Sequence, residues 1–364
     1  MIKSEPDRKR SKDLGIDLKT IKLFEKIAKA VAPPPIMTVS QWADAERRLS
    51  AESSAEAGRW NTDRAPYQRE ILDAVNNPEC EEVVIMSSAQ VGKTELILNT
   101  IGYYIDYDPA PILVVNPTIE MAQTFSKDRL APMIRDTPAL REKVRDAKSK
   151  NSGNTILHKQ FPGGHITMAG ANSPASLASR PIRIALMDEI DRYPASAGTE
   201  GNPIKLAEKR TTTFWNRKKI KVSTPTIKGQ SQIEAEFLTG SQEEWCVPCP
   251  CCGKYQPYEW GRIHFSDVTM ECKFCGEHIS EVDWKQQKGK YIAKFPDRKR
   301  KRSFHLNELA SPWKHWEEII REFREAQKEL KENGDINKMK TWINTTLGET
   351  WEERGKSCLL YTSD

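Results

Sequence analysis

The chain has 364 residues, of which 38% are hydrophobic and 29% charged. This length suits one large α/β core plus a smaller module, because single hydrophobic cores stop growing at roughly 250–300 residues. No apolar run approaches the roughly 18 residues that a membrane helix needs, and no signal-type stretch precedes Met37, so we expect a cytoplasmic protein without membrane contact. The net charge of +5 balances 56 basic against 51 acidic residues, which by itself barely favours a nucleic-acid partner.

Residues 1–60 are predicted to be an amino-terminal arm and linker. The arm begins with a basic stretch that includes residues 8–10. A short helical pattern follows through Leu18, Ile21, Phe24, Ile27 and Ala28. The break Pro33-Pro34-Pro35 then ends this pattern and indicates a linker.

Residues 61–240 show the pattern of an α/β domain. From about Pro66 to Gly229, short apolar runs alternate with helix-like segments, which is typical of a mostly parallel sheet with helices on both faces. Five of these runs are rich in β-forming residues and end in polar residues, glycine or proline; they are residues 83–86, 112–115, 166–169, 182–187 and 219–223. We therefore expect a sheet that contains these five strands.

A candidate phosphate-binding loop lies between the first of these strands and a helix. Its residues are Ser87, Ser88, Ala89, Gln90, Val91, Gly92, Lys93 and Thr94. In such a loop, backbone N–H groups and the helix N-terminus bind phosphates, the lysine reaches the outer phosphates, and the hydroxyl binds Mg²⁺. Gly-Lys-Thr is a common triplet, but its place between strand and helix favours an ATP site and a P-loop, RecA-like fold. Ser87 departs from the general pattern, which has glycine there.

The strand predicted at 182–187 ends in two carboxylates, Asp188 and Glu189. A buried strand with this ending is the expected partner of a phosphate loop, because the first carboxylate holds Mg²⁺ through water and the second polarises the attacking water. An isolated Asp-Glu pair is more often a solvated acidic turn. Because this pair follows a phosphate loop, we expect Asp188 and Glu189 to be catalytic together with Lys93.

Two further segments are candidates for nucleotide contact. The strand predicted at 219–223 runs into Thr224-Pro225-Thr226, where hydroxyls can change partners when the γ-phosphate leaves and relay hydrolysis to DNA-gripping parts. The alternative is a simple proline turn with capped hydroxyls. Upstream, Tyr67 and Gln68 are candidates for contact with adenine, by ring stacking and by amide hydrogen bonds.

Residues 241–290 are predicted to be a zinc-ribbon module. Cys249, Cys252, Cys272 and Cys275 form two C-x2-C pairs with 19 residues between the pairs, a spacing that gives a tetrahedral Zn²⁺ site of four thiolates. A structural zinc is favoured over a catalytic one, because no open position or adjacent base is evident. Cys246 and Cys251 remain alternative ligands.

Residues 291–364 are predicted to be a return segment and a helical linker, with an amphipathic helix from Trp316 to about Asn333. The basic run at 298–302, like those at 8–10 and 217–221, offers charge for DNA phosphates, an interaction that salt weakens. The alternative for each run is a solvated basic surface.

In this order, the motifs resemble those of the lambda-like terminase large subunits, over about residues 40 to 355. A serine at the first position of the loop is usual in that family, so Ser87 supports the resemblance. The segments that carry it are Tyr67-Gln68, the loop 87–95, Asn116-Pro117-Thr118, Ser179-Arg180-Pro181 with 188–194, 223–226, the Cys-Pro-x-Cys-Gly knuckle, 304–307 with 311–313, and 344–348.

The resemblance implies an ATP-driven motor that docks on the capsid portal in the host cytoplasm, works with a small terminase subunit and pulls double-stranded viral DNA into the prohead, with its subunits in a ring. It also implies that Lys93 and Thr94 bind the phosphates and Mg²⁺, that Asp188 binds the metal and that Glu189 activates water. Members of this family carry a carboxyl-terminal endonuclease. Because this chain stops at Asp364, roughly where that domain would begin, we expect it to be truncated before the nuclease and to lack nuclease activity.

An arginine is also expected at the γ-phosphate, where it would stabilise the charge that develops during transfer. Four arginines near the acidic strand are candidates, and the sequence does not choose among them: Arg180, Arg183, Arg192 and Arg210.

Two other functions remain as alternatives. A superfamily-2-type helicase shares the phosphate loop, the acidic strand and the threonine-rich strand end, but it needs a second RecA-like domain, and the residues after Gly229 show no second set of alternating strands. A non-enzymatic zinc-ribbon DNA-binding protein would carry a degenerate nucleotide site, and the intact pairs Lys93-Thr94 and Asp188-Glu189 argue against it.

Overall fold

The computed structural model describes residues 17, 19–20, 23–24, 37–52, 54, 56–144, 153–174, 177 and 180–353. Most of the helical pattern expected in the arm, the proline break at 33–35 and the basic run at 8–10 lie outside these residues. Residues 1–37 and 38–364 are separate units, and the elements below belong to the second. Among the helices described, none is long and apolar enough to cross a bilayer.

Ten strands form one large sheet in the order β10-β9-β15-β3-β8-β7-β4-β6-β5, with β14 also paired to β9. All pairs from β9 to β6 are parallel, and only β5, β10 and β14 join antiparallel. The strands are β3 (Glu82–Ser87), β4 (Ile112–Asn116), β5 (His158–Phe161), β6 (Gly164–Gly170), β7 (Ile184–Asp188), β8 (Lys218–Ser223), β9 (Glu243–Pro248), β10 (Tyr255–Pro257), β14 (Lys290–Ala293) and β15 (Lys301–Leu306).

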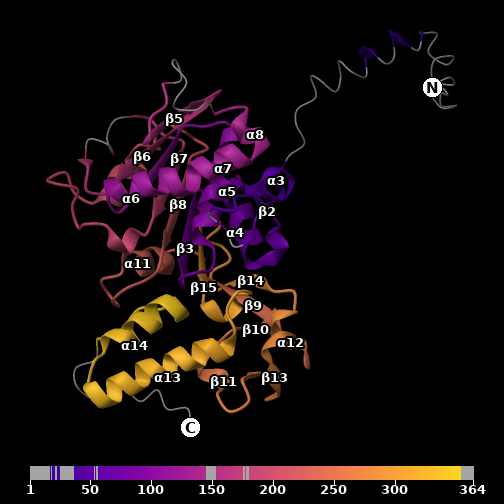
Figure 1. Ribbon diagram of the computed structural model, residues 1–364, viewed down its shortest axis with the longest axis vertical. Helices are drawn as coiled ribbons and strands as arrows, with labels where there is room; N and C mark the ends of the chain where they lie inside the picture. Colours follow the sequence, from indigo (N-terminus) through magenta and orange to yellow (C-terminus); the bar gives the residue numbers. More distant parts are fainter. Residues whose placement is uncertain are drawn as a thin grey trace. The chain divides into compact units, whose positions relative to one another are not determined.

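The expected α/β class and its five strands are confirmed, because β3, β8, β7, β4 and β6 lie side by side as the middle of this sheet. The sheet also contains a parallel strand that the sequence pattern did not indicate, β15, which lies between β9 and β3 (Figure 1). The sheet thus draws strands from all three segments predicted after residue 60, and residues 38–364 form one compact unit.

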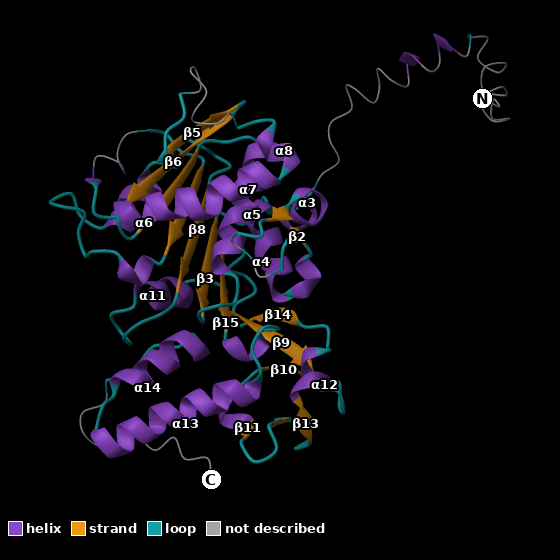
Figure 2. Ribbon diagram, viewed as in Figure 1, coloured by secondary structure: helices purple, strands orange, loops and turns teal. Residues whose placement is uncertain are grey.

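The connections place helices on both faces of the sheet (Figure 2). The crossover from β3 to β4 runs toward one edge, whereas the crossover from β7 to β8 runs back. Because parallel crossovers are right-handed, opposite directions put their helices on opposite faces. The helices of this part are α4 (Tyr67–Asn76), α5 (Lys93–Asp106), α6 (Ile119–Thr124), α7 (Ala131–Asp136), α8 (Pro138–Arg141), α10 (Pro203–Lys209) and α11 (Gln232–Leu238), with a π-helical turn at Phe125–Leu130.

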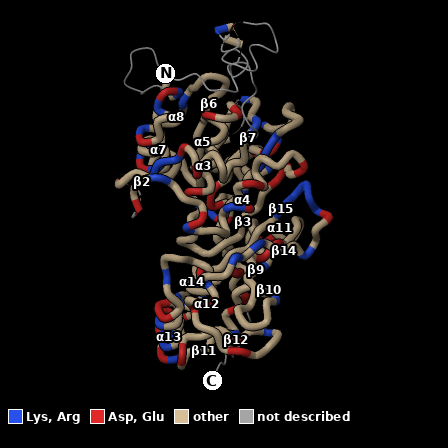
Figure 3. Tube along the Cα trace, turned by 90° about the vertical axis from the view of Figure 1, so that its right-hand side faces the viewer, with Lys and Arg blue, Asp and Glu red and all other residues tan. Residues whose placement is uncertain are grey.

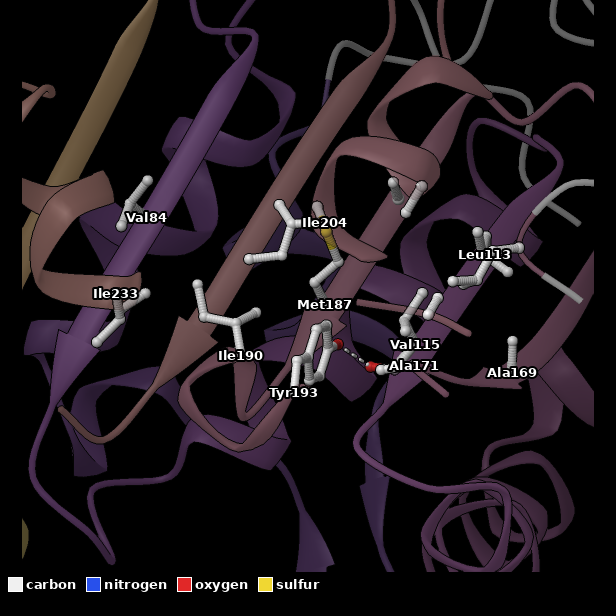
Figure 4. Packing of buried hydrophobic residues seen from close by; sticks show 14 of the residues in the cluster. Val84, Leu113, Val115, Ala169, Ala171, Met187, Ile190, Tyr193, Ile204 and Ile233 are labelled. Atoms are coloured by element: carbon white, nitrogen blue, oxygen red, sulfur yellow. Dashed lines mark hydrogen bonds between the residues drawn. The ribbon is translucent and has the colours of Figure 1, made fainter. Parts of the chain in front are cut away.

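The core on one face lies between the sheet and helices α10 and α11. Alternate residues of β3, Val84 and Met86, belong to the same buried cluster as Ile204 of α10 and Ile233 of α11 (Figure 4). Alternation puts these side chains on one face, as expected for a strand. The turn after β7 is fixed to this core by Tyr193, whose hydroxyl donates to the Val115 carbonyl at 2.7 Å.

Part of the segment expected as a linker packs against α5. Helix α3 (Val39–Glu46) begins with a capping box formed by Thr38 and Gln41. Its Trp42 ring lies on α5 at Gly102, where a Cβ atom would come within 2.1 Å of the ring. Glycine at this position therefore allows α3 to lie close to α5. Two short strands follow, β1 (Arg48–Leu49) and β2 (Gly58–Arg59).

The remaining residues form a smaller region beside β9 and β15 (Figure 1). A three-stranded antiparallel sheet contains β11 (Ile263–His264), β12 (Thr269–Glu271) and β13 (His278–Ser280), followed by α12 (Glu281–Lys285). The predicted amphipathic helix is α13 (Trp316–Asn333), which ends at Gly334 in the left-handed conformation. It packs against α14 (Asn337–Trp342), which continues into a π-helical turn at Ile343–Leu347.

The basic runs at 217–221 and 298–302 are largely paired with carboxylates within the chain. Lys and Arg positions are interspersed with Asp and Glu positions along the trace (Figure 3). Arg217 and Arg300 both contact Glu81, and Arg302 contacts Glu243. The most buried member is Lys221, which is 0% exposed and lies 3.3 Å, 2.5 Å and 2.8 Å from carboxylate oxygens of Glu82, Glu208 and Glu236. Much of this charge is therefore paired within the chain, and a contact of these runs with DNA phosphates stays a prediction.

Candidate nucleotide site and cysteine cluster

The candidate phosphate loop joins the end of β3 to the start of α5. Two residues adopt the left-handed conformation, Gln90 at φ +57° and Gly92 at φ +87°. The left-handed conformation favours glycine at position 92, and a Cβ atom there would come within 2.2 Å of the Gln68 amide nitrogen and displace that side chain. Ser87 and Ser88 are buried, whereas Gln90 is exposed. The loop is thus held on its strand side and is exposed in its middle, at Gln90.

Side chains from three neighbouring strand ends meet at this loop. Lys93, on the first turn of α5, lies with its Nζ 3.3 Å from Oε1 of Glu189, which follows β7. The same Nζ donates to the hydroxyl of Thr224, which follows β8. Three predicted site residues from distant parts of the sequence are therefore in contact. Ser87, Ser88, Ala89, Gln90, Val91 and Thr94 lie on the same loop and helix start.

The two carboxylates after β7 differ in environment. Burial of the Asp188 carboxyl, reinforced by the neighbouring charge of Glu189, raises its pKa to about 7, and Lys93 opposes this shift. Glu189 adopts the left-handed conformation at φ +53°, which is uncommon for a residue with a side chain. Such backbone strain is often found at functional sites. A cation that binds both carboxylates would favour their charged forms.

Asp191 connects this acidic turn to the end of β8, a contact that the sequence motifs did not indicate. Its carboxylate accepts hydrogen bonds from the Thr226 hydroxyl at 2.8 Å and from the backbone N–H of Ile233 at 2.7 Å. Its backbone N–H donates to the Ser223 hydroxyl at 3.2 Å. The signals in the sequence were its position two residues after Glu189 and its place in the segment 188–194 that carries the family resemblance.

Tyr67 and Gln68 lie on the first turn of α4, beside the loop. The Gln68 amide nitrogen donates to the Val91 carbonyl at 3.1 Å, and its Oε1 is buried without a hydrogen-bond partner. Tyr67 is 1% exposed and packs edge-on against Trp245, with ring centroids 6.2 Å apart. In this structure Gln68 shapes the loop and Tyr67 presents no exposed ring face, so an adenine contact by either residue stays a prediction.

The four candidate arginines have different surroundings. Arg183 forms two hydrogen bonds to Asp108, at 2.8 Å and 2.5 Å, which hold its side chain at the start of β7. Arg192 has a 64% exposed side chain whose Nε lies 3.8 Å from Oε2 of Glu189. Arg180 is exposed, and the Nε of Arg210 is buried without a hydrogen-bond partner. Arg192 is the candidate that contacts a predicted catalytic residue.

A second candidate site lies in the smaller region. The sulfur atoms of Cys249, Cys252, Cys272 and Cys275 all lie within 4.8 Å of one another. The Cys249–Cys275 and Cys252–Cys272 sulfur pairs are each 3.8 Å apart. A tetrahedron with Zn–S bonds of ~2.3 Å has edges of about 3.8 Å, so the spacing fits zinc, and it is far longer than the roughly 2.05 Å of a disulfide.

The backbone around the cysteines also suits bound thiolates. The N–H groups of Cys252 and Phe274 point at the sulfurs of Cys249 and Cys272, at 3.5 Å and 3.4 Å. Of the alternatives, Cys246 lies in β9, where burial raises the pKa of its thiol to about 12, and Cys251 is exposed. Neither belongs to the cluster.

Two family models match the chain. Residues 54–291 match the ATPase domain of the phage terminase large subunit gpA. Residues 301–360 match the endonuclease domain of the same protein, so the expectation that the chain stops before this domain, and therefore lacks nuclease activity, is not supported. The position of the chain end was a poor guide, because the matched segment begins at β15, inside the ATPase sheet.

The chain is similar to curated large terminase subunits of two phages. It is 32% identical to that of Enterobacteria phage P21 and 29% identical to that of Escherichia phage lambda, over 89% and 88% of its own length. It spans about half, 54%, of the length of each of these relatives. The large terminase ATPase domain of Thermus phage P74-26 is 15% identical with a TM-score of 0.44, over 83% of this chain and 99% of that one. Because the ATPase model alone covers more than half of the sequence, the chain belongs to the phage terminase large-subunit family.

Proposed function

We propose that this chain is the ATP-hydrolysing motor part of a terminase, which moves double-stranded viral DNA into the prohead. The observation that carries the proposal is the convergence of Lys93, Glu189 and Thr224 at three neighbouring strand ends, in a chain of this family. A cation from a phosphate loop, a carboxylate and a hydroxyl are the groups needed to bind a γ-phosphate, to polarise a water and to sense the phosphate.

The residues fit distinct roles in hydrolysis. Lys93 and the N–H groups from Gln90 to Thr94 would bind the β- and γ-phosphates of ATP at the start of α5. The Thr94 hydroxyl and the Asp188 carboxylate would hold Mg²⁺, which neutralises phosphate charge when bound. Glu189 would orient a water for attack and accept its proton. Arg192, whose exposed side chain lies beside Glu189, would be the arginine that stabilises charge at the γ-phosphate.

The partners follow from the family and are part of the proposal. Relatives of this chain are named large terminase subunits, which supports double-stranded DNA, a small terminase subunit and a capsid portal as partners. A motor that encircles DNA would act as a ring of identical subunits in the host cytoplasm. In such a ring, the exposed Arg192 could act at its own site or at a neighbour's.

The proposal is tested by steady-state ATP hydrolysis of the purified chain, with and without linear double-stranded DNA. We expect turnover that rises when DNA is added and that is lost in Lys93→Ala. The matched control is Lys209→Ala, a change at an exposed lysine of α10. Turnover that survives Lys93→Ala would contradict the assigned site. A rate of ATP hydrolysis that does not change when DNA is added would contradict the role as a DNA motor. Failure to bind ATP would contradict both the assigned site and the motor role.

We also propose that the cysteine cluster binds one structural zinc ion, which would stabilise a ribbon formed by the two knuckles and the sheet β11-β12-β13. Four thiolates leave no open position, which is typical of structural sites. The support is the mutual proximity of the four sulfurs, two pairs of which are 3.8 Å apart, and the N–H groups directed at them.

Elemental analysis of protein purified without chelators should find one zinc ion per chain. Cys272→Ser should lower the zinc content to well below one and destabilise this region, because zinc binding contributes directly to folding. Cys251→Ser is the control and should retain the metal, since Cys251 is exposed and outside the cluster. Equal loss of zinc in both variants, or no zinc in the unaltered protein, would contradict the site.

A further inference from the structure

The π-helical turn Ile343–Leu347 and the residues after it lie directly against the phosphate loop. The backbone N–H of Ala89 donates to the Thr345 carbonyl at 2.7 Å, and that of Ser88 donates to the Leu306 carbonyl of β15 at 2.9 Å. Gly348, at φ +67°, has room for no side chain, because a Cβ atom would lie 2.6 Å from the Ser88 nitrogen. Of the first N–H groups of the loop, that of Ser88 is therefore held by the end of β15 and that of Ala89 by the segment that follows α14.

The same segment also contacts the turn after β8. The side-chain nitrogen of Asn344 donates to the carbonyls of Thr226 and Glu349, both at 2.7 Å. The backbone N–H of Trp351 donates to the Thr226 carbonyl at 2.8 Å, and the Lys228 N–H donates to the Trp351 carbonyl at 2.9 Å. One short stretch of chain thus joins the phosphate loop to the strand end that carries Thr224.

Asn344 is the side chain at the centre of this connection. It is 8% exposed, and both hydrogens of its amide group are accounted for by carbonyls of two different chain segments. The hydroxyl of Thr226, whose carbonyl accepts from Asn344, donates to the Asp191 carboxylate in the acidic turn. Thr224, two residues earlier, contacts Lys93. A shift of the turn would therefore move Thr224 relative to the lysine that we assign to the phosphates.

We propose that Asn344 is a positioning residue for ATP hydrolysis: it fixes the Thr224–Thr226 turn relative to the phosphate loop without contacting the nucleotide. The inference rests on the proposed function and assigns a role to a segment that this function leaves unused. Because small misplacements of reacting groups cost large factors in rate, the role belongs to the chemical step and not to nucleotide affinity.

The first test separates turnover from binding in Asn344→Ala. We expect its kcat to fall by about 10- to 100-fold, since a displacement of about 1 Å can cost that much. The Kd for ATP should stay within about twofold, because the loop keeps its backbone contacts through Thr345 and Leu306. Thr350→Val is the control, since it removes a hydrogen bond from the same segment to Glu234 and not to Thr226. It should leave kcat unchanged.

Three results would overturn the proposal: an unchanged kcat in Asn344→Ala, an equal loss of kcat in Thr350→Val, or a loss confined to the Kd for ATP. Gly348→Ala tests the contact with the loop itself, because the added Cβ atom would displace the loop. We expect this variant to weaken ATP binding, and a normal Kd would contradict the contact between this segment and the loop.

A second readout does not depend on turnover. In Glu189→Gln protein, ATP should slow hydrogen exchange at the Lys228 and Trp351 amides, because coupling between the loop and the turn acts in both directions. In Glu189→Gln with Asn344→Ala, ATP should still bind but should no longer change this exchange. In the Glu189→Gln protein, ATP binding without any effect on exchange would overturn this inference alone. If the Glu189→Gln protein did not bind ATP, the proposed function would be overturned as well.

Discussion

Replacing Glu189 with glutamine should lower ATP turnover by about 10²- to 10⁴-fold, the range that general-base groups contribute. An amide of the same size cannot accept the proton of the attacking water. Binding of ATP should persist, because the loop and its contacts to Gln68 and Thr345 do not involve the Glu189 carboxylate. Removal of that charge also frees Lys93 from the partner that lies 3.3 Å away, which favours phosphate at the lysine.

Phosphate release and calorimetric ATP binding on the same protein would measure both effects. Glu200→Gln is a suitable control, because this carboxylate is exposed in the loop that follows the acidic turn. It should hydrolyse ATP at the unaltered rate. If Glu189→Gln kept its activity, or if it lost ATP binding as well as turnover, Glu189 would not be the base.

Replacing Lys221 with methionine should destabilise the fold by about 3–5 kcal/mol, the cost of breaking a buried ion pair from one side. Lys221 is fully buried among carboxylates from β3, α10 and α11. Methionine fills similar space but leaves Glu208 and Glu236 with less compensating charge. Urea unfolding followed by circular dichroism would measure the loss in the free energy of unfolding.

Lys205→Met is the matched control for this change. Lys205 contacts two of the same carboxylates, Glu208 at 3.0 Å and Glu236 at 3.7 Å, but its side chain is 62% exposed. Exposed pairs contribute about 1 kcal/mol or less. A similar loss in both variants would show that burial of Lys221 is not what makes its pairs important.

Acid should reduce the difference between the Lys221→Met variant and the unaltered protein. Burial disfavours the Glu236 carboxylate, but the charges of Lys221 and Lys301 outweigh it and lower the pKa of Glu236 to about 2. A carboxylate with a depressed pKa contributes stability above its unfolded pKa of about 4.3 and loses it as pH falls toward its folded pKa. The difference in unfolding free energy should therefore shrink between about pH 4.5 and pH 2, and a constant difference over this range would contradict the assignment.

Local patterns predicted the middle of the sheet, and they predicted the phosphate loop and the acidic pair of the nucleotide site. Strands β3, β4 and β7 are apolar runs with clear ends, β6 and β8 carry β-branched residues among polar ones, and both the phosphate loop and the Asp188-Glu189 pair are contiguous motifs. Strand β15 gave no such signal. Its sequence begins with Lys301 and Arg302, whose charges are paired with Glu236 and Glu243, and unlike β8 it contains no β-branched residue.

The missed parts of the site depend on contacts between distant segments. The hydrogen bond from Asn344 to Thr226 joins residues 118 apart in the chain. Its acceptor is a backbone carbonyl, which every type of residue has, so the residue type at position 226 does not indicate it. Asp191 likewise acts through Thr226 and Ile233. The ion pairs of the basic runs could not be predicted either, because their carboxylate partners lie in other segments and no local pattern pairs them.

The place of β15 has a consequence for how the protein is made. Strand β3, which leads into the phosphate loop, pairs on one side with β8 and on the other with β15, and β15 is synthesised more than 200 residues after β3. A nascent chain can pair β3 with β8 early, but the other edge of β3 stays open until residue 306 has left the ribosome. Because open strand edges favour association with other chains, the half-built sheet is exposed to aggregation during synthesis, and the phosphate loop gains its contact with Thr345 only after residues 343–347 have been made.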